Sequence, residues 1–155
     1  MSLNKNYYEA VLASNTNILH KFHAKLTALI NFMQQNKNTQ NLITVNKRIR
    51  RVLLDHDNYP NDIEYLIKSI KPSLFAQNQT IESTIFEKLK LDYKKCANLN
   101  WQEQLELFSK YSTPLNQLFD GLMIIDKNQE IKDNRLQLLK AIRLMILNVA
   151  DISLI

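Results

Sequence analysis

The chain has 155 residues, and its 20 Lys and Arg against 15 Asp and Glu give a formal net charge of +5. Apolar residues make up 45% and charged residues 23%, which excludes a disordered chain and suits one globular domain of ordinary size. The single glycine excludes the glycine-rich loops that cradle nucleotide phosphates, because such loops need several positions with positive φ or close backbone approach.

Cysteine use and the start of the chain bear on where the protein works. The lone Cys96 forms neither a disulfide framework nor a zinc-ligand pattern, which fits a reducing compartment. No apolar run is long enough to span a bilayer, and no signal peptide follows the initial methionine. We therefore expect a cytoplasmic protein with no membrane partner. Residues 1–3 resemble a remnant of an expression vector.

Apolar residues recur at helical spacing along the chain, and few residues suit tight β-turns. Good helix N-caps stand at Asn15-Thr16, near Asp62 and at Asn100. A hydroxyl cap at Ser112-Thr113, with Pro114 in the first helical turn, indicates that a helix restarts there. We predict an all-α bundle of six to seven helices, without strands, in a single domain over residues 1–155. In chain order, the expected helical segments are residues 7–13, 15–35, 40–54, 62–70, 80–97, a stretch from 101 that restarts at 112 and reaches 125, and a last helix from 129.

The last predicted helix carries a guanidinium on its apolar side. Arg135 falls near the middle of that face and Asn134 at its edge, where an unpaired buried charge would be very costly. We expect Arg135 to form an internal ion pair with Asp120 or Asp126, the nearest carboxylates in sequence; the alternative is an arginine presented to a ligand. On a helical wheel, the apolar face of this segment consists of Ile131, Leu138, Leu139, Ile142, Met145, Ile146, Val149 and Ile152. The opposite face consists of Asp133, Gln137, Lys140, Asn148 and Asp151.

A compact basic cluster lies in the third predicted helix. Four cations occur within five residues and fan across the outer face, and such a cluster suits phosphate oxygens. The equal alternative is a merely solvated basic face. The cations are Lys47, Arg48, Arg50 and Arg51, and the inner face consists of Leu42, Val45, Ile49, Val52 and Leu53.

No set of residues suggests catalysis or metal binding. His20 and His23 could share a helical face, but a metal site needs a third ligand, and Lys21 and Lys25 make the surroundings cationic. The carboxylates are scattered rather than paired, and no nucleophile with a matching base is suggested. We predict no catalytic residue and no metal ligand.

Several segments, in order along the chain, resemble the bacterial glycyl-tRNA synthetase beta subunit. The most specific are Phe119-Asp120, Asn134-Arg135-Leu136 and the final Ala150-Asp151-Ile152-Ser153-Leu154. The segment VNKR, from Val45 to Arg48, is similar to an Ala-Asn-Lys-Arg segment of that family, with valine where alanine is usual. The likeness is strong at the end of the chain and weaker over residues 58–111.

The resemblance implies a helical, DALR-type anticodon-binding domain, related to that of arginyl-tRNA synthetase. It implies that this chain is the carboxy-terminal piece of a longer beta subunit, and that the active site for glycyl-adenylate lies in a separate alpha subunit. The parent ligase, with two alpha and two beta subunits, joins glycine to tRNA using ATP and Mg²⁺. This piece would need no cofactor and would do no chemistry. Its partners would be the tRNA for glycine, the alpha subunit and the rest of the beta subunit.

The tRNA-binding candidates are Lys47, Arg48, Arg50, Arg51 and Asn134. The anticodon of this tRNA contains cytosines, whose N4 donor suits a carboxylate or carbonyl reader. The alternative function is a helical module for subunit or domain assembly without RNA contact. For that role, the leucines outside the main apolar face of the last helix would form a second interface, namely Leu136, Leu144 and Leu147.

Overall fold

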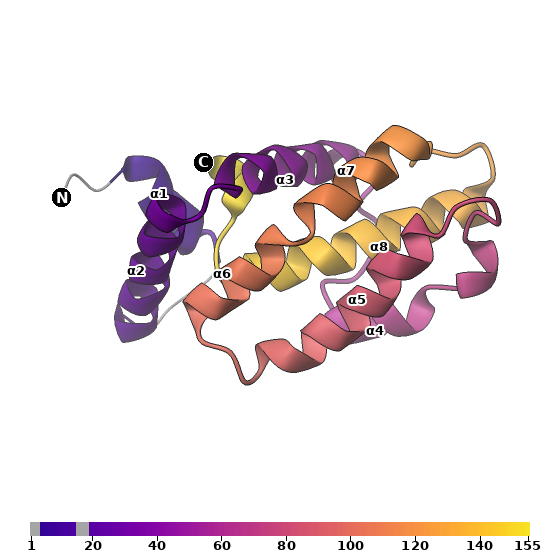
Figure 1. Cartoon of the computed structure of the whole chain (residues 1–155). Coiled ribbons are helices and arrows are strands. Elements are labelled where there is room, and N and C mark those ends of the chain that lie inside the picture. The colour runs from indigo at the N-terminus through magenta and orange to yellow at the C-terminus, as the bar shows by residue number, and fades with distance from the viewer. Residues whose placement is uncertain (1–3, 15–18) are drawn as a thin grey trace.

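The computed structural model describes residues 4–14 and 19–155, and over these ranges the chain is helical and has no strand (Figure 1). The all-α prediction is confirmed. The predicted cap Asn15-Thr16 and residues 1–3 lie outside the described residues. The helices are α1 Lys5–Leu12, α2 Leu19–Gln35, α3 Thr39–Leu54, α4 Ile63–Ser69, α5 Ile81–Cys96, α6 Trp101–Ser109, α7 Ser112–Gly121 and α8 Gln129–Leu147, with short 3-10 turns η1 Pro72–Leu74 and η2 Ile152–Leu154.

Side-chain caps fix where several helices begin. Asp62 Oδ1 accepts a hydrogen bond from Tyr65 N at 3.0 Å at the start of α4. Asn100 and Glu103 form a reciprocal capping box at α6: Asn100 Oδ1 accepts from Glu103 N at 2.9 Å, and Glu103 Oε2 accepts from Asn100 N at 2.8 Å. The predicted caps at Asp62 and Asn100 are therefore present, and both follow from local sequence alone. The hydroxyl cap predicted at Ser112-Thr113 is wrong, because Tyr111 stands at the N-cap position of α7 and no side chain caps that helix.

Helix α7 is shorter than predicted. It ends at Gly121 rather than at residue 125, and Leu122 has an extended backbone with φ −132° and ψ 144°. In the turn that follows, Ile124 is buried and the Met123 carbonyl accepts a hydrogen bond from Arg135 at 2.7 Å. The backbone leaves the helix because these contacts with other segments replace the next helical turn.

Helix α8 runs through the middle of the molecule, with α3 and α7 on one side and α4 and α5 on the other (Figure 1). Leu138, Leu139, Ala141 and Ile142 are fully buried, so the apolar face predicted for this segment does form the core. Helices α1 and α2 pack together at one end of the molecule, where α2 contacts α6 and α1 contacts η2.

The polar face predicted for α8 is wrong at Lys140. Its side chain is 5% exposed, and Nζ bonds Asp57 and the Tyr59 carbonyl, the latter at 2.9 Å. Leu136, predicted to lie outside the apolar face, is fully buried. Helix α4 and the segment before it cover this side of α8, so the helix is enclosed almost all round.

The chain does not end as a helix. Helix α8 stops at Leu147, and the last residues turn back onto α1 and α3 as η2. Asp151 N donates to the Ala10 carbonyl at 2.9 Å, and Val149 and Ile152 are fully buried. The expectation that the terminal apolar run is core is confirmed, but a separate turn supplies it rather than the helix face. No helix in the described ranges is both long and apolar enough to cross a membrane.

Candidate nucleic-acid interface

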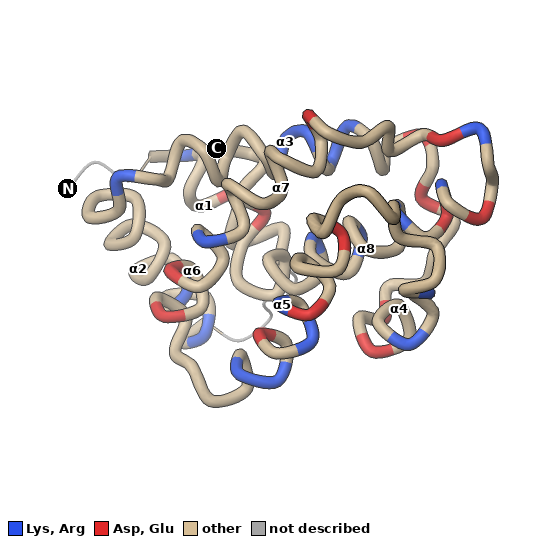
Figure 2. The backbone as a smooth tube through the Cα atoms, turned by 45° about the vertical axis from the view of Figure 1, so that its right-hand side comes forward, with Lys and Arg blue, Asp and Glu red and all other residues tan. Residues whose placement is uncertain are grey.

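Helix α3 presents three cations away from the core. Its inner residues Leu42, Val45 and Ile49 are fully buried, which fixes the rotation of the helix and turns the intervening positions outward. Basic residues on α3 lie along the outer edge of the molecule in Figure 2. Three of the four predicted cations are exposed and form no ion pair with any described residue: Lys47, Arg50 and Arg51.

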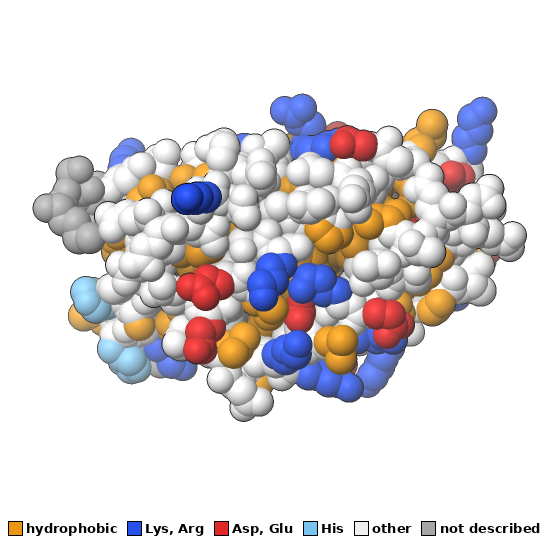
Figure 3. Space-filling model, in the orientation of Figure 1, with side chains coloured by type: hydrophobic (Ala, Val, Ile, Leu, Met, Phe, Trp, Pro, Cys, Tyr) orange, Lys and Arg blue, Asp and Glu red, His pale blue; other side chains and the backbone are white. Residues whose placement is uncertain are grey.

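The net charge of the chain is +5, but outside α3 the basic residues do not form one continuous positive patch on the face shown in Figure 3. On this face, Lys and Arg side chains are interspersed with Asp and Glu (Figure 3). Several of these cations are paired, such as Lys88 with Asp92 and Lys90 with Glu87. Lys47, Arg50 and Arg51 therefore form a cluster suited to hold phosphates, because no described residue takes their donors.

Arg48, the fourth predicted cation, differs from the other three. Its guanidinium bonds Asn116 Oδ1 and Asp120 Oδ1, each at 3.2 Å, and its Cζ lies 4.5 Å from the centre of the Phe119 ring. All three partners come from α7. The side chain of Arg48 is 38% exposed and that of Asp120 is 72% exposed, so the cluster lies at the surface.

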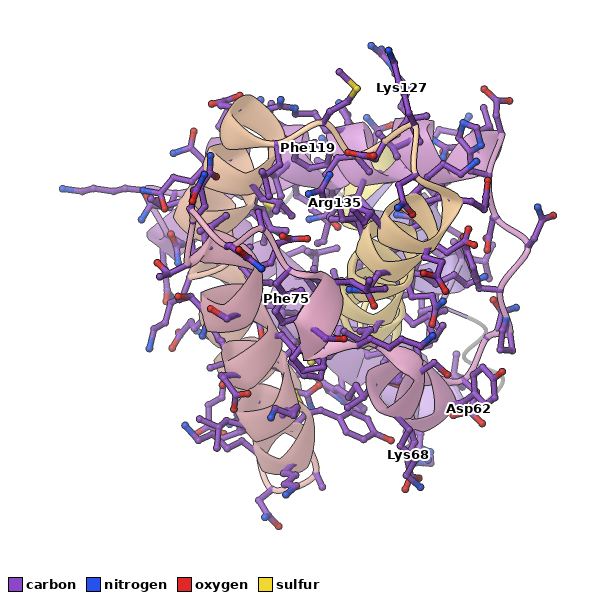
Figure 4. All side chains as sticks on the ribbon, turned by 90° about the vertical axis from the view of Figure 1, so that its right-hand side faces the viewer. Asp62, Lys68, Phe75, Phe119, Lys127 and Arg135 are labelled. Carbon is purple, nitrogen blue, oxygen red and sulfur yellow. The ribbon has the colours of Figure 1, made fainter. Side chains whose placement is uncertain are left out.

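Arg135 is held inside the molecule by three acceptors. Its Nε donates to Glu82 Oε1 at 3.0 Å, and its NH1 donates to the Met123 carbonyl at 2.7 Å and to Asp126 Oδ2 at 3.3 Å. Of the two carboxylates expected as partners, Asp126 contacts Arg135, whereas Asp120 pairs with Arg48 instead. Arg135 points into the interior beside α8 (Figure 4).

Sequence reasoning missed Glu82, although a signal for it existed. Glu82 is 1% exposed and shares the buried face of α5 with Ile85, Phe86 and Leu89, at helical spacing. Its second oxygen, Oε2, accepts from Ala76 N at 2.7 Å. A carboxylate on an apolar face requires a partner just as an arginine does, so a helical wheel of α5 could have marked Glu82 as a buried charge, although not which residue it contacts.

Asn134, a predicted tRNA contact, lies inside the structure and not on its surface. It is 3% exposed; Oδ1 accepts from Lys71 N at 2.7 Å, and Nδ2 donates to the Lys71 carbonyl at 3.0 Å. The amide thus satisfies both backbone groups of the residue before Pro72, where the chain is in an extended conformation. With both ends of the amide engaged and the residue buried, Asn134 has no group to offer to RNA.

Tyr111 and Cys96 lie near the carboxylate of Asp92, and burial raises the pKa of both. Tyr111 OH donates to Asp92 Oδ2 at 2.9 Å, and burial, with the charge of Asp92, raises the pKa of Tyr111 well above its usual value. Burial, followed by the Asp92 charge, raises the pKa of the Cys96 thiol to about 11, which opposes thiolate formation. His20 and His23 are exposed, and the described residues contain no group of three or more side chains that could hold a metal ion.

An open groove of about 1050 Å³ lies where the ends of α5 and α8 meet the starts of α4 and α6. Its lining includes Trp101 and Cys96, together with Leu144 and Leu147, two of the three leucines predicted to lie off the main face of the last helix. The third of these leucines, Leu136, is fully buried in the core.

No family model matches the chain. It is 29% identical over 150 residues to a protein named glycine–tRNA ligase beta subunit from Lawsonia intracellularis, covering 95% of this chain and 21% of that protein. It is 27% identical over 151 residues to the protein of the same name from Aliivibrio salmonicida, and the match again covers 95% of this chain and 21% of that protein. The protein of the same name from Shewanella denitrificans is 29% identical over 150 residues, which cover 94% of this chain and 20% of that protein. The chain thus spans about a fifth of the length of the curated relatives it matches.

Proposed function

We propose that this chain binds tRNA, as the carboxy-terminal, anticodon-arm-binding part of a glycine–tRNA ligase beta subunit. The similarity to proteins of that name extends over 95% of the chain, which supports the assignment of the whole fragment rather than of one motif. The observation that carries RNA binding is the set of three exposed, unpaired cations on α3, Lys47, Arg50 and Arg51. The all-helical architecture is compatible with a DALR-type domain.

In this proposal α3 holds the sugar-phosphate backbone. Arginine can grip a phosphate with two parallel donors, whereas lysine acts as a mobile point charge. Such contacts fix the register and orientation of the RNA but carry no sequence information. Glycyl-tRNA synthesis itself, with ATP and Mg²⁺, belongs to the rest of the parent enzyme and its alpha subunit. This part would contribute position, and no catalytic or metal-binding residue.

The test is the salt dependence of tRNA binding. Replacing Lys47, Arg50 and Arg51 together with alanine should weaken binding similarly for tRNAs of any anticodon. The slope of log affinity against log salt should flatten by about 0.7 to 0.9 for each lost phosphate contact. The control variant also loses three positive charges, by alanine substitution of three exposed lysines outside α3. These lysines form no ion pair with the described residues: Lys37, Lys95 and Lys110.

Two results would count against RNA binding through α3. One is a salt slope in the α3 triple variant equal to that of the wild type. The other is an equal flattening in the control variant, which would reduce the effect to net charge. Nitrocellulose filter binding over a salt series measures all three proteins in the same way.

The groove favours a second candidate function, that of an assembly module without RNA contact. Leu144 and Leu147 are partly exposed in its lining, and partly exposed leucines at a groove are typical of protein contacts. Under this reading the wild-type chain would show no salt-dependent affinity for tRNA. It would instead co-purify with the synthetase alpha subunit, and substitution of Leu144 and Leu147 by serine would abolish that co-purification.

A further inference from the structure

Arg48 and Asp120 join two helices at the surface, close to the free cations of α3. They are 72 residues apart in the sequence, and they meet because α3 packs beside α7 (Figure 1). Phe119, beneath Arg48, lies at the end of the molecule that carries the turn between α7 and α8 (Figure 4). An exposed ion pair of this kind normally contributes little to stability. The organisation around Arg48 therefore calls for another explanation.

The guanidinium of Arg48 is held from one side only. The Phe119 ring lies 4.5 Å from Cζ, and Asn116 and Asp120 each take one donor at 3.2 Å. The side chain nevertheless keeps 38% of its surface exposed. Asp120 uses Oδ1 for Arg48, and its Oδ2 has no hydrogen bond among the described residues. A planar cation with a fixed orientation thus lies next to a free carboxylate oxygen.

We infer that Arg48, Phe119 and Asp120 form a binding site for an unpaired RNA base that carries an exocyclic amino group, with cytosine as its pyrimidine ligand. Unstacked bases bind proteins by stacking on aromatic rings and on arginine planes, and an Arg48 plane supported by Phe119 offers such a platform. The Asp120 Oδ2 would accept a hydrogen bond from the cytosine N4 amino group. Uracil presents an oxygen at the same position, which the carboxylate would repel.

The neighbouring cations could hold the phosphate of a nucleotide whose base lies on Arg48. Arg51 lies three residues after Arg48, so the two side chains are neighbours on the helix surface, and Lys47 directly precedes Arg48. A nucleotide whose phosphate is held by these cations could direct its base onto Arg48. The inference rests on the proposed function and adds base discrimination to the backbone contacts, which by themselves read no sequence.

The test compares RNA hairpins that differ only in having an all-cytosine or an all-uracil loop, measured by fluorescence anisotropy at one salt concentration. The wild-type chain should bind the cytosine loop about tenfold more tightly. Asp120→Ala should reduce this preference to less than about twofold, while the salt slope stays near the wild-type value. Because the substitution removes both the acceptor for the cytosine N4 group and the repulsion of uracil, the cytosine loop should bind more weakly than to the wild type and the uracil loop at least as tightly.

Two matched variants sharpen the result. Glu106→Ala removes an exposed carboxylate on α6 and should leave the cytosine preference unchanged. Arg48→Lys keeps the charge and loses the planar platform, so it should weaken binding to both loops. A wild-type chain that binds both loops equally, or an Asp120→Ala variant that keeps the full preference, overturns the base site while leaving phosphate binding by α3 intact. A wild-type chain without salt-dependent binding to any hairpin overturns the proposed function as well.

Discussion

Arg135 and Glu82 form an ion pair that is almost completely enclosed, with Nε and Oε1 3.0 Å apart and side-chain exposures of 6% and 1%. The pair joins α8 to the first turn of α5. Through Met123, Asp126 and Ala76 it also secures the turn before α8 and the link before α5. A buried charge left without its partner is strongly destabilising, so this cluster stabilises the packing of α5 against α8 at the end of the molecule seen in Figure 4.

We predict that Arg135→Met, which keeps the length and removes the charge, lowers the free energy of unfolding by about 3 to 5 kcal/mol. The substitution leaves Glu82 buried and unpaired and deprives the Met123 carbonyl of its donor. Urea denaturation followed by circular dichroism measures the loss. Arg50→Met, at an exposed and unpaired arginine, is the control and should change stability little. If Arg135→Met keeps wild-type stability but fails to bind tRNA, Arg135 contacts RNA instead.

Asn134→Ala should act on stability and not on RNA affinity. The substitution removes two part-buried hydrogen bonds to the Lys71 backbone, each worth about 0.5 to 1.5 kcal/mol. Thermal melting should show the loss, and Asn148→Ala, at an exposed asparagine, serves as the control. Filter binding well below the melting temperature should give a wild-type tRNA affinity. A clear loss of affinity in the folded variant would restore Asn134 as an RNA contact.

Removing residues 149–155 should abolish cooperative unfolding. The truncation deletes the buried Val149 and Ile152, each worth roughly 1.5 to 3 kcal/mol, and uncovers the inner sides of α1 and α3. Asp151→Ala tests the same segment more gently. It breaks the two bonds to Arg143, at 3.3 and 3.1 Å, and the cap on Ser153 N. A truncated chain that melts like the intact one would contradict the role of η2 in the core.

Cys96 should react slowly with iodoacetamide at neutral pH. Its pKa of about 11 leaves the thiolate roughly three-hundred-fold scarcer than for an ordinary cysteine, whose pKa is about 8.5. Because deprotonation creates the reactive form, the rate should keep rising as the pH is raised above 9. Asp92→Asn removes the nearby negative charge and should lower the pKa, and so speed alkylation at a given pH. A rate that levels off near pH 9 in the wild type would contradict this prediction.

The local features of this protein follow from its sequence because a helix satisfies its own backbone within a few residues. The caps at Asp62 and Asn100, the restart at Ser112 and the inner and outer faces of α3 depend only on neighbours along the chain. The need of Arg135 for a carboxylate was also evident, since an unpaired charge on an apolar face is untenable.

Asp126 was expected as a partner of Arg135, but only the tertiary structure decided which groups far apart in the sequence meet. Glu82, the Lys71 backbone and Asp57 are the partners of Arg135, Asn134 and Lys140, and each lies more than fifty residues from the side chain it contacts. A helical wheel assumes that one side of a helix faces water. It fails for α8 because α3, α4 and α5 enclose that helix. The packing of α7 beside α3 also joins Arg48 to Asp120, whereas the other three cations of α3 form no ion pair with the described residues. The spacing of the four cations could not reveal this difference, because it depends on which helix lies beside α3.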